Sequence, residues 1–130
     1  MNPFEHLVYR YSELVDAGDF AGAGDLFRHG SYVGSSGVFS GAQAVTDMLT
    51  RVVITYDGTP RTKHVVTNVI VDGDSARSYV TVYQGLPDVP LRPIVAGRYF
   101  DRFAEVDGEW GFLERRIRVD LVGDTSRHLR

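Results

Sequence analysis

The sequence predicts an α+β domain in which three N-terminal helices pack on a curved, mainly antiparallel sheet. Apolar residues recur at helical spacing over residues 3–53, and residues 61–121 form a series of strand-like segments separated by turn signals. A long sheet twists and curves, so helices against one face give a cone with an interior where a small ligand can bind. The 130 residues are expected to form one domain, 1–130.

The first helix is predicted over residues 3–18. Asn2 can cap it, Pro3 suits its first turn, and Gly18 suits its end. Its apolar stripe comprises Phe4, Leu7, Val8, Tyr11, Leu14 and Val15.

Two more helices and two short strands are expected before the main sheet. Asp19 is a suitable N-cap for a helix over residues 20–27. Residues 29–34 and 38–39 are predicted to be extended, and a third helix is predicted over residues 42–53.

The strand predicted over residues 61–71 is apolar on both faces, which indicates a sheet covered on both sides. Strict alternation would place His64, Val66, Asn68 and Ile70 on one face. Antiparallel strands are expected to follow over 76–84, 95–105 and 110–121, after which residues 123–130 form a polar tail. Three prolines within residues 85–93 predict a loop there.

Composition excludes several classes of function. The chain has no cysteine, which rules out disulfides and cysteine-based metal sites or nucleophiles. A net charge of −3 argues against nucleic-acid binding, and no apolar run is long enough to span a membrane. The N-terminal residues lack the pattern of a signal peptide, so a cytoplasmic protein is expected. The four histidines lack metal-ligand spacing, and neither a metal nor another cofactor is expected.

Tyr11, Asp16 and His64 form a candidate acid/base set. A neutral imidazole can take a proton while a carboxylate on its other nitrogen fixes the tautomer and stabilises the imidazolium. A tyrosine hydroxyl can donate to a leaving hydroxyl or to an enolate oxygen. Such a set suits proton abstraction beside a carbonyl, with loss of water or a double-bond shift. The structural alternatives are a core tyrosine, a surface carboxylate and a histidine that caps a neighbouring carbonyl.

Five segments resemble the SnoaL-like branch of the nuclear transport factor 2-like superfamily. They are residues 11–20 (YSELVDAGDF), 38–41 (VFSG), 62–68 (TKHVVTN), 97–103 (GRYFDRF) and 107–110 (DGEW). The resemblance covers nearly the whole chain. It implies an α+β cone with a deep pocket, commonly paired as a homodimer through the sheet.

Two members of that superfamily, bile-acid 7α-dehydratase and scytalone dehydratase, use an aspartate on the first helix and a histidine on the first long strand. Asp16 and His64 match those positions. The bile-acid enzyme also has a tyrosine five residues before the aspartate, matched by Tyr11, and another on the strand after the second helix, matched by Tyr32. The resemblance therefore implies catalytic roles for Asp16, His64 and Tyr11.

The same resemblance implies contacts with a ligand. The last-strand arginine of the bile-acid enzyme falls near Arg116 or Arg118, and the pocket asparagine of scytalone dehydratase falls near Tyr99. The second histidine of scytalone dehydratase corresponds to about Val80, which argues against a scytalone-type substrate. The expected substrate-binding residues are Tyr32, Asn68, Tyr99, Arg116 and Arg118.

The predicted function is that of a small-molecule lyase or isomerase acting on an apolar, oxygenated ligand such as a polyketide or steroid. A non-catalytic binding protein of the same fold and a polyketide cyclase are the alternatives. The expected partners are that ligand and a second copy of the chain, and the loop at residues 123–126 could reach over the edge of such a dimer.

Overall fold

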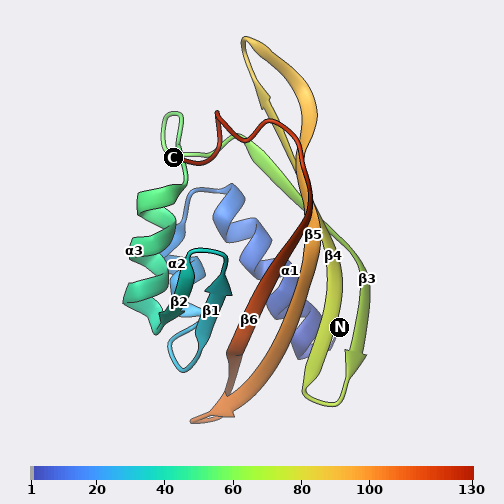
Figure 1. The fold of residues 1–130 in the computed structure, drawn as a ribbon. Coiled ribbons are helices and arrows are strands. Elements are labelled where there is room, and N and C mark those ends of the chain that lie inside the picture. Colours follow the sequence, from blue (N-terminus) through green and yellow to red (C-terminus); the bar gives the residue numbers. More distant parts are fainter. Residues whose placement is uncertain (1) are drawn as a thin grey trace.

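The computed structural model describes residues 2–130 and has the predicted α+β architecture. Within that range three helices lie on one side of a strongly curved six-stranded sheet (Figure 1). The helices are α1 (Pro3–Asp16), α2 (Phe20–Asp25) and α3 (Ala42–Val52). The strands are β1 (Ser31–Gly34), β2 (Gly37–Ser40), β3 (Thr62–Asp72), β4 (Ser75–Leu86), β5 (Val89–Val106) and β6 (Glu109–Val122).

The helix caps predicted from the sequence are confirmed. Asn2 Oδ1 accepts a hydrogen bond of 2.8 Å from the backbone N–H of Phe4, and Asp19 Oδ1 accepts one of 2.8 Å from Gly22. Gly18 follows α1 with a φ of +78°, and a Cβ there would lie 1.9 Å from the carbonyl oxygen of Gly58. Only glycine fits this close crossing, which holds the end of α1 beside the loop that leads into β3.

The sheet has the order β2-β1-β6-β5-β4-β3. Strands β3 to β6 form the predicted antiparallel meander, whereas β1 pairs with β6 in parallel and with β2 as a hairpin. The order leaves β3 at one edge of the sheet. Helix α1 packs on the concave side of the sheet, so residues near the start of β3 lie under the C-terminal end of that helix.

Aromatic side chains fill the space between the helices and the concave face of the sheet. Phe4 of α1 stacks on Phe103 of β5 with ring centroids 4.5 Å apart, and Phe27 stacks on Phe112 of β6 at 4.9 Å. All four rings are buried. This cluster stabilises the helical layer on the sheet.

The expectation of a sheet covered on both sides is wrong. The convex face is open to solvent: Val65 is 42% exposed and Tyr79 is 53% exposed. A β-bulge also breaks the alternation predicted for β3. Asn68 has a φ of +55°, and the pairing register with β4 shifts between Thr67 and Ile70. One extra residue turns the later side chains to the opposite faces, so Asn68 and Ile70 are exposed on the convex side.

The loop predicted over residues 85–93 is also wrong, because β4 continues to Leu86 and β5 begins at Val89. Residues 89–93 of β5 pair with β4 alone, since the pairing of β5 with β6 starts at Val95. A strand with one free side tolerates proline, whose missing N–H would otherwise interrupt a ladder. Register shifts after Val82 and after Gln84 accommodate the remaining irregularity.

Candidate active site

Asp16 and His64 are in direct contact. Asp16 is the last residue of α1. His64 lies near the start of β3, which passes beneath that end of the helix. The Nδ1 atom of His64 is 2.6 Å from Asp16 Oδ1. The backbone N–H of His64 donates to Asp16 Oδ2 at 2.8 Å, and the hydroxyl of Thr62 donates to Asp16 Oδ1 at 2.8 Å. Three hydrogen bonds therefore fix the carboxylate and the ring that it holds.

The environment keeps the Asp16 carboxylate charged. Its side chain is 10% exposed and that of His64 is 9% exposed. Burial acts to raise the pKa of Asp16, but the hydrogen bonds and charge of His64 and the hydroxyl of Thr62 outweigh burial and lower it. A carboxylate also gains nothing at the C-terminal end of a helix dipole. A charged Asp16 accepts the Nδ1 proton of His64, which leaves the other ring nitrogen, Nε2, free to accept a proton.

Three tyrosines lie together in the interior. The Tyr11 ring lies 6.3 Å from the rings of both Tyr32 and Tyr99, measured between centroids. Burial raises the pKa of all three phenols above its ordinary value. Each phenol is therefore protonated over the working range of a protein and can donate a hydrogen bond.

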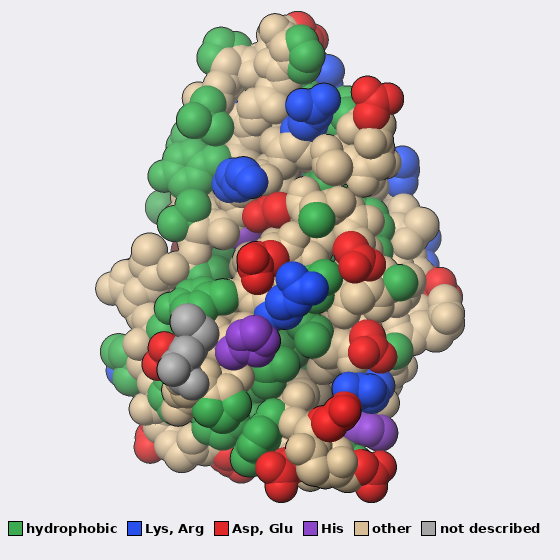
Figure 2. Space-filling model, turned by 180° about the vertical axis from the view of Figure 1, so that it is seen from behind, with side chains coloured by type: hydrophobic (Ala, Val, Ile, Leu, Met, Phe, Trp, Pro, Cys, Tyr) green, Lys and Arg blue, Asp and Glu red, His purple; other side chains and the backbone are tan. Residues whose placement is uncertain are grey.

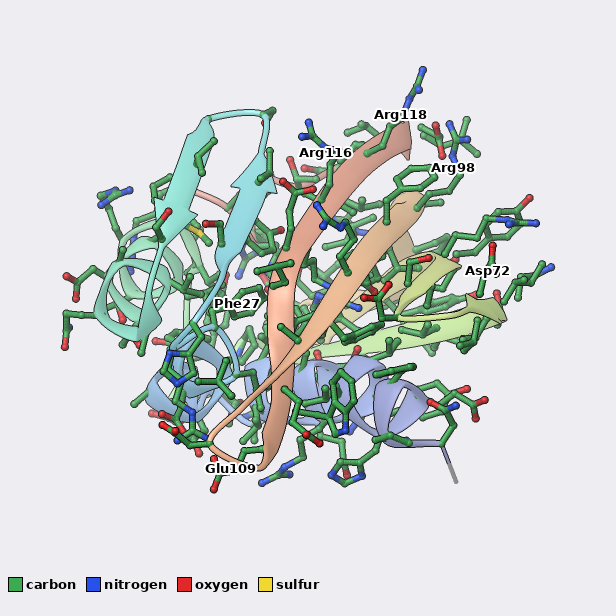
Figure 3. The ribbon with its side chains drawn as sticks, turned by 90° about the horizontal axis from the view of Figure 1, so that it is seen from below. Phe27, Asp72, Arg98, Glu109, Arg116 and Arg118 are labelled. Atoms are coloured by element: carbon green, nitrogen blue, oxygen red, sulfur yellow. The ribbon has the colours of Figure 1, made fainter. Side chains whose placement is uncertain are left out.

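The interior arginine is Arg115, one residue from the predicted register. Arg116 and Arg118 are exposed, and Figure 3 shows both on the side of the sheet away from α1. The cause is a bulge: Phe103 pairs with Phe112 while Arg102 pairs with Glu114, so β6 contains one extra residue. In the sequence, only the apolar side chain of Ile117 indicates which residues of this strand face inward after the bulge. Arg115, two residues earlier, faces the same side.

Arg115 is fully buried and forms a bidentate ion pair with Asp101. Its Nε and Nη2 atoms donate to the two carboxylate oxygens at 2.8 and 2.9 Å. Burial acts to lower the pKa of Arg115, but the charge and hydrogen bonds of Asp101 outweigh burial and raise it. The guanidinium therefore stays charged. The guanidinium carbon lies 3.6 Å from the Tyr99 ring centroid and 4.9 Å from that of Tyr11. Within residues 2–130 its buried Nη1 atom has no hydrogen-bond partner.

The C-terminal tail, residues 123–130, lies across the protein's own site. Figure 1 shows it crossing from β6 to the C-terminal end of α3. His128 is only 6% exposed, and its ring centroid is 6.5 Å from that of His64. Residues 127–130 therefore contact their own chain, whereas the reach of residues 123–126 over a dimer edge stays a prediction. Sequence reasoning missed His128, because nothing in a polar tail indicates that one residue is buried.

Asn68 lies outside the interior. It lines a hollow of about 250 Å³ on the convex face together with Ile70, Tyr79, Arg98 and others. A larger hollow of about 470 Å³ separates the β1–β2 turn from β6 and is lined by residues that include Val33, Ile117 and Val119. The linings of these two hollows do not include Asp16 or His64.

Other chemistry is not indicated by the described residues. Among residues 2–130, no three His, Cys, Asp or Glu side chains gather where a metal ion could be held, and no helix is long and apolar enough to cross a membrane. Acidic and basic side chains are interspersed on the face seen in Figure 2, with no continuous basic patch on that face.

Residues 5–116 match the SnoaL-like domain family over most of the chain. The chain belongs to the SnoaL-like family. A search of curated proteins finds no match. Among solved structures, a protein of unknown function from Mycobacterium tuberculosis is 28% identical with a TM-score of 0.74, over 91% of this chain and 70% of that one.

Two more distant structures share the fold of this SnoaL-like protein. A putative scytalone dehydratase from Novosphingobium aromaticivorans is 21% identical with a TM-score of 0.69, over 94% of this chain and 85% of that one. ActVI-ORFA from Streptomyces coelicolor is 18% identical with a TM-score of 0.75, over 91% of this chain and 95% of that one.

Proposed function

We propose that this SnoaL-like protein is a small-molecule lyase or isomerase that removes a proton from the carbon beside a carbonyl group. The observation that carries the proposal is the contact between Asp16 and His64, with 2.6 Å between Oδ1 and Nδ1. A buried carboxylate that fixes one nitrogen of an imidazole makes the other nitrogen a general base. The structural alternative, a histidine that caps a backbone carbonyl, is not the arrangement found, because Nδ1 of His64 faces a carboxylate.

The proposed reaction begins when His64 Nε2 takes a proton from the carbon beside the carbonyl. The electron pair of the broken C–H bond forms a carbon–carbon double bond, and the carbonyl oxygen becomes an enolate. In a dehydration, the enolate electrons then expel the hydroxyl from the next carbon, and the His64 imidazolium protonates it to give water. In an isomerisation, the imidazolium returns the proton to a different carbon. His64 ends neutral in both cases, and Asp16 stabilises the imidazolium between the steps.

The tyrosine cluster and Arg115 complete the proposed site. The Tyr11 phenol is the proposed donor to the enolate oxygen or to the departing hydroxyl, and Tyr32 and Tyr99 orient the ligand. Arg115 takes the place that we predicted for Arg116 or Arg118: its charge lies directly behind Tyr99 and Tyr11. A buried cation there favours negative charge that develops on a ligand oxygen held by these phenols.

An apolar, oxygenated ligand of polyketide or steroid type suits the proposed site. Aromatic rings provide flat apolar contacts, while three phenols and two imidazoles offer hydrogen bonds to a few oxygens. The positions of Asp16, His64 and Tyr11 follow the resemblance to scytalone dehydratase and bile-acid 7α-dehydratase. Association as a homodimer through the convex face is part of the same proposal, since exposed Val65 and Tyr79 lie there.

A non-catalytic binding protein is the second candidate. It is supported by the phenols of Tyr11 and Tyr99, which can hold a ligand oxygen in the interior without any proton transfer. A protein that only stores or carries a ligand needs the same cone without a turnover step.

Turnover of a bicyclic β-hydroxyketone distinguishes the two candidates. Dehydration of β-hydroxytetralone gives a dienone that tautomerises to fluorescent naphthol, and a β,γ-unsaturated ketosteroid tests isomerisation by the absorbance of the conjugated product. We expect wild-type turnover on one of these, and a fall of about 10²–10⁴-fold in kcat for His64→Gln and Asp16→Asn.

Asp120→Asn is the matched control, because this carboxylate pairs with Arg98 on the convex face. It should leave kcat unchanged. Binding of both compounds without turnover would support the carrier function instead, and equal losses in Asp120→Asn and Asp16→Asn would remove the case for a specific dyad.

A further inference from the structure

We propose that His128 is a second functional imidazole of this site, which donates a hydrogen bond to the carbonyl oxygen of the ligand while His64 faces the neighbouring carbon. The inference rests on the proposed function and adds a group to it: His64 removes the proton, and His128 donates a hydrogen bond to the carbonyl oxygen. The second imidazole comes from the C-terminal tail. Strand β4 has the aliphatic residue Val80 and does not supply an imidazole.

The two rings are placed for a shared partner. Their centroids are 6.5 Å apart and their planes make an angle of 68°. This is too far for direct hydrogen bonding between the rings, and a ligand carbonyl group placed between them would present its oxygen to His128 and its neighbouring carbon to His64. The Nδ1 atom of His128 is buried and has no hydrogen-bond partner among the described residues. A buried unpartnered imidazole nitrogen is costly, and a ligand oxygen would satisfy it.

The tail holds this ring in place through its backbone on both sides. The carbonyl oxygen of Arg127 accepts a hydrogen bond of 2.5 Å from the Tyr56 hydroxyl and one of 3.1 Å from Gln84 Nε2. The carbonyl oxygen of His128 accepts one of 2.8 Å from the backbone N–H of Ile54. These contacts fix the backbone without using the imidazole, so anchoring of the tail does not require a histidine at this position.

Arg130 anchors the tail independently of the imidazole. Its Nη1 atom donates to the carbonyl oxygens of Thr50 and Arg51, both at 3.2 Å, at the C-terminal end of α3. A cation at a helix C-terminus is favourable. Arg130 can therefore be changed to test the anchor while the His128 ring is kept.

The electrostatic surroundings keep His128 neutral. Burial and, to a lesser extent, the charge of His64 lower its pKa to about 4, although Asp16 acts to raise it. A neutral imidazole still donates one N–H, so it can polarise a carbonyl oxygen without repelling the imidazolium that forms at His64. The two histidines would thus differ in role because only His64 contacts the carboxylate.

Histidine-selective ¹⁵N NMR with α-tetralone tests whether both rings contact the ligand. This ketone has no hydroxyl to lose, so binding is observed without dehydration. We expect ring-nitrogen resonances of His64 and His128 to shift along one saturation curve. A shift at His64 alone would overturn the inference and leave the proposed function intact. No shift at either ring would overturn the inference together with this ligand class.

Turnover of β-hydroxytetralone by tail variants tests the chemical role. We expect His128→Phe, which fills the space but cannot donate, to lower kcat by about 10²-fold. His128→Gln restores an N–H donor and should recover part of that loss. Arg130→Ala weakens the anchor while keeping the ring, and it should alter KM more than kcat. A loss of kcat in Arg130→Ala as large as in His128→Phe would show that His128 acts only as an anchor and would overturn the inference.

Discussion

The buried ion pair between Arg115 and Asp101 supplies the sharpest prediction about stability. Both side chains are fully buried, and two hydrogen bonds of 2.8 and 2.9 Å join them. In Asp101→Asn the guanidinium keeps a neutral partner of similar size but loses its counter-charge in a fully buried site. Removing one partner of a buried pair typically costs about 3–5 kcal/mol, because the other charge stays uncompensated.

That cost is a large share of the free energy of unfolding of a small domain, which is about 5–15 kcal/mol. For a domain of this size, 3–5 kcal/mol corresponds to a fall in Tm of roughly 10–20 °C. Urea unfolding followed by circular dichroism measures the change directly. The double variant Asp101→Leu with Arg115→Met replaces the pair by apolar side chains and should recover most of the loss.

A loss below about 1 kcal/mol in Asp101→Asn would refute this reasoning. It would show that the interior admits enough water to solvate the guanidinium. The double variant separates the two effects of Arg115, because a stable protein without the guanidinium but with reduced turnover would assign the cation to the chemistry rather than to the fold.

Three further predictions concern pH and the backbone. Between pH 6.5 and about 4, wild type should lose up to about 3 kcal/mol more stability than His128→Phe, as measured by urea unfolding at each pH. The imidazole of the unfolded chain binds a proton in this range, whereas the buried ring, with its lowered pKa, does not. At the β3 bulge, Asn68→Val should cost about 1–2 kcal/mol and Asn68→Gly should be nearly neutral in thermal unfolding, since the φ of +55° is disfavoured for β-branched residues. Gly18→Ala should lower Tm by more than Gly37→Ala does, because only the first meets a backbone atom, the carbonyl oxygen of Gly58 at 1.9 Å.

The sequence was sufficient for the order of the elements, because each signal was local. Asn2 and Asp19 cap the helices that they were predicted to cap. Glycine-containing turns separate β3 from β4 and β5 from β6 as expected. Asp16 and His64 are 48 residues apart in the chain, however, and their contact depends on the angle at which α1 crosses β3. Spacing alone left that contact open, and the resemblance to the SnoaL-like branch indicated it.

The errors in the predicted site residues arose where one extra residue in a strand changes which side chains face inward. The bulge at Asn68 moved that residue to the convex face, and the bulge opposite Arg102 made Arg115 the interior arginine in place of Arg116. A bulge is set by pairing with a neighbouring strand, so no pattern within a single strand reveals it. The burial of His128 likewise follows from tertiary contacts of the tail with α3 and with the loop before β3.

Exchange of the protons beside the carbonyl of α-tetralone, followed by ¹H NMR in D₂O, tests the central claim most directly. It measures proton removal by His64 alone and does not depend on whether the natural reaction is a dehydration or an isomerisation. We predict that wild type accelerates the exchange, that Asp16→Asn slows it by at least about 10²-fold, and that His64→Gln returns it to the buffer rate. Exchange at the buffer rate with wild type, or unchanged acceleration in His64→Gln, would contradict the assignment of Asp16 and His64 as the catalytic pair.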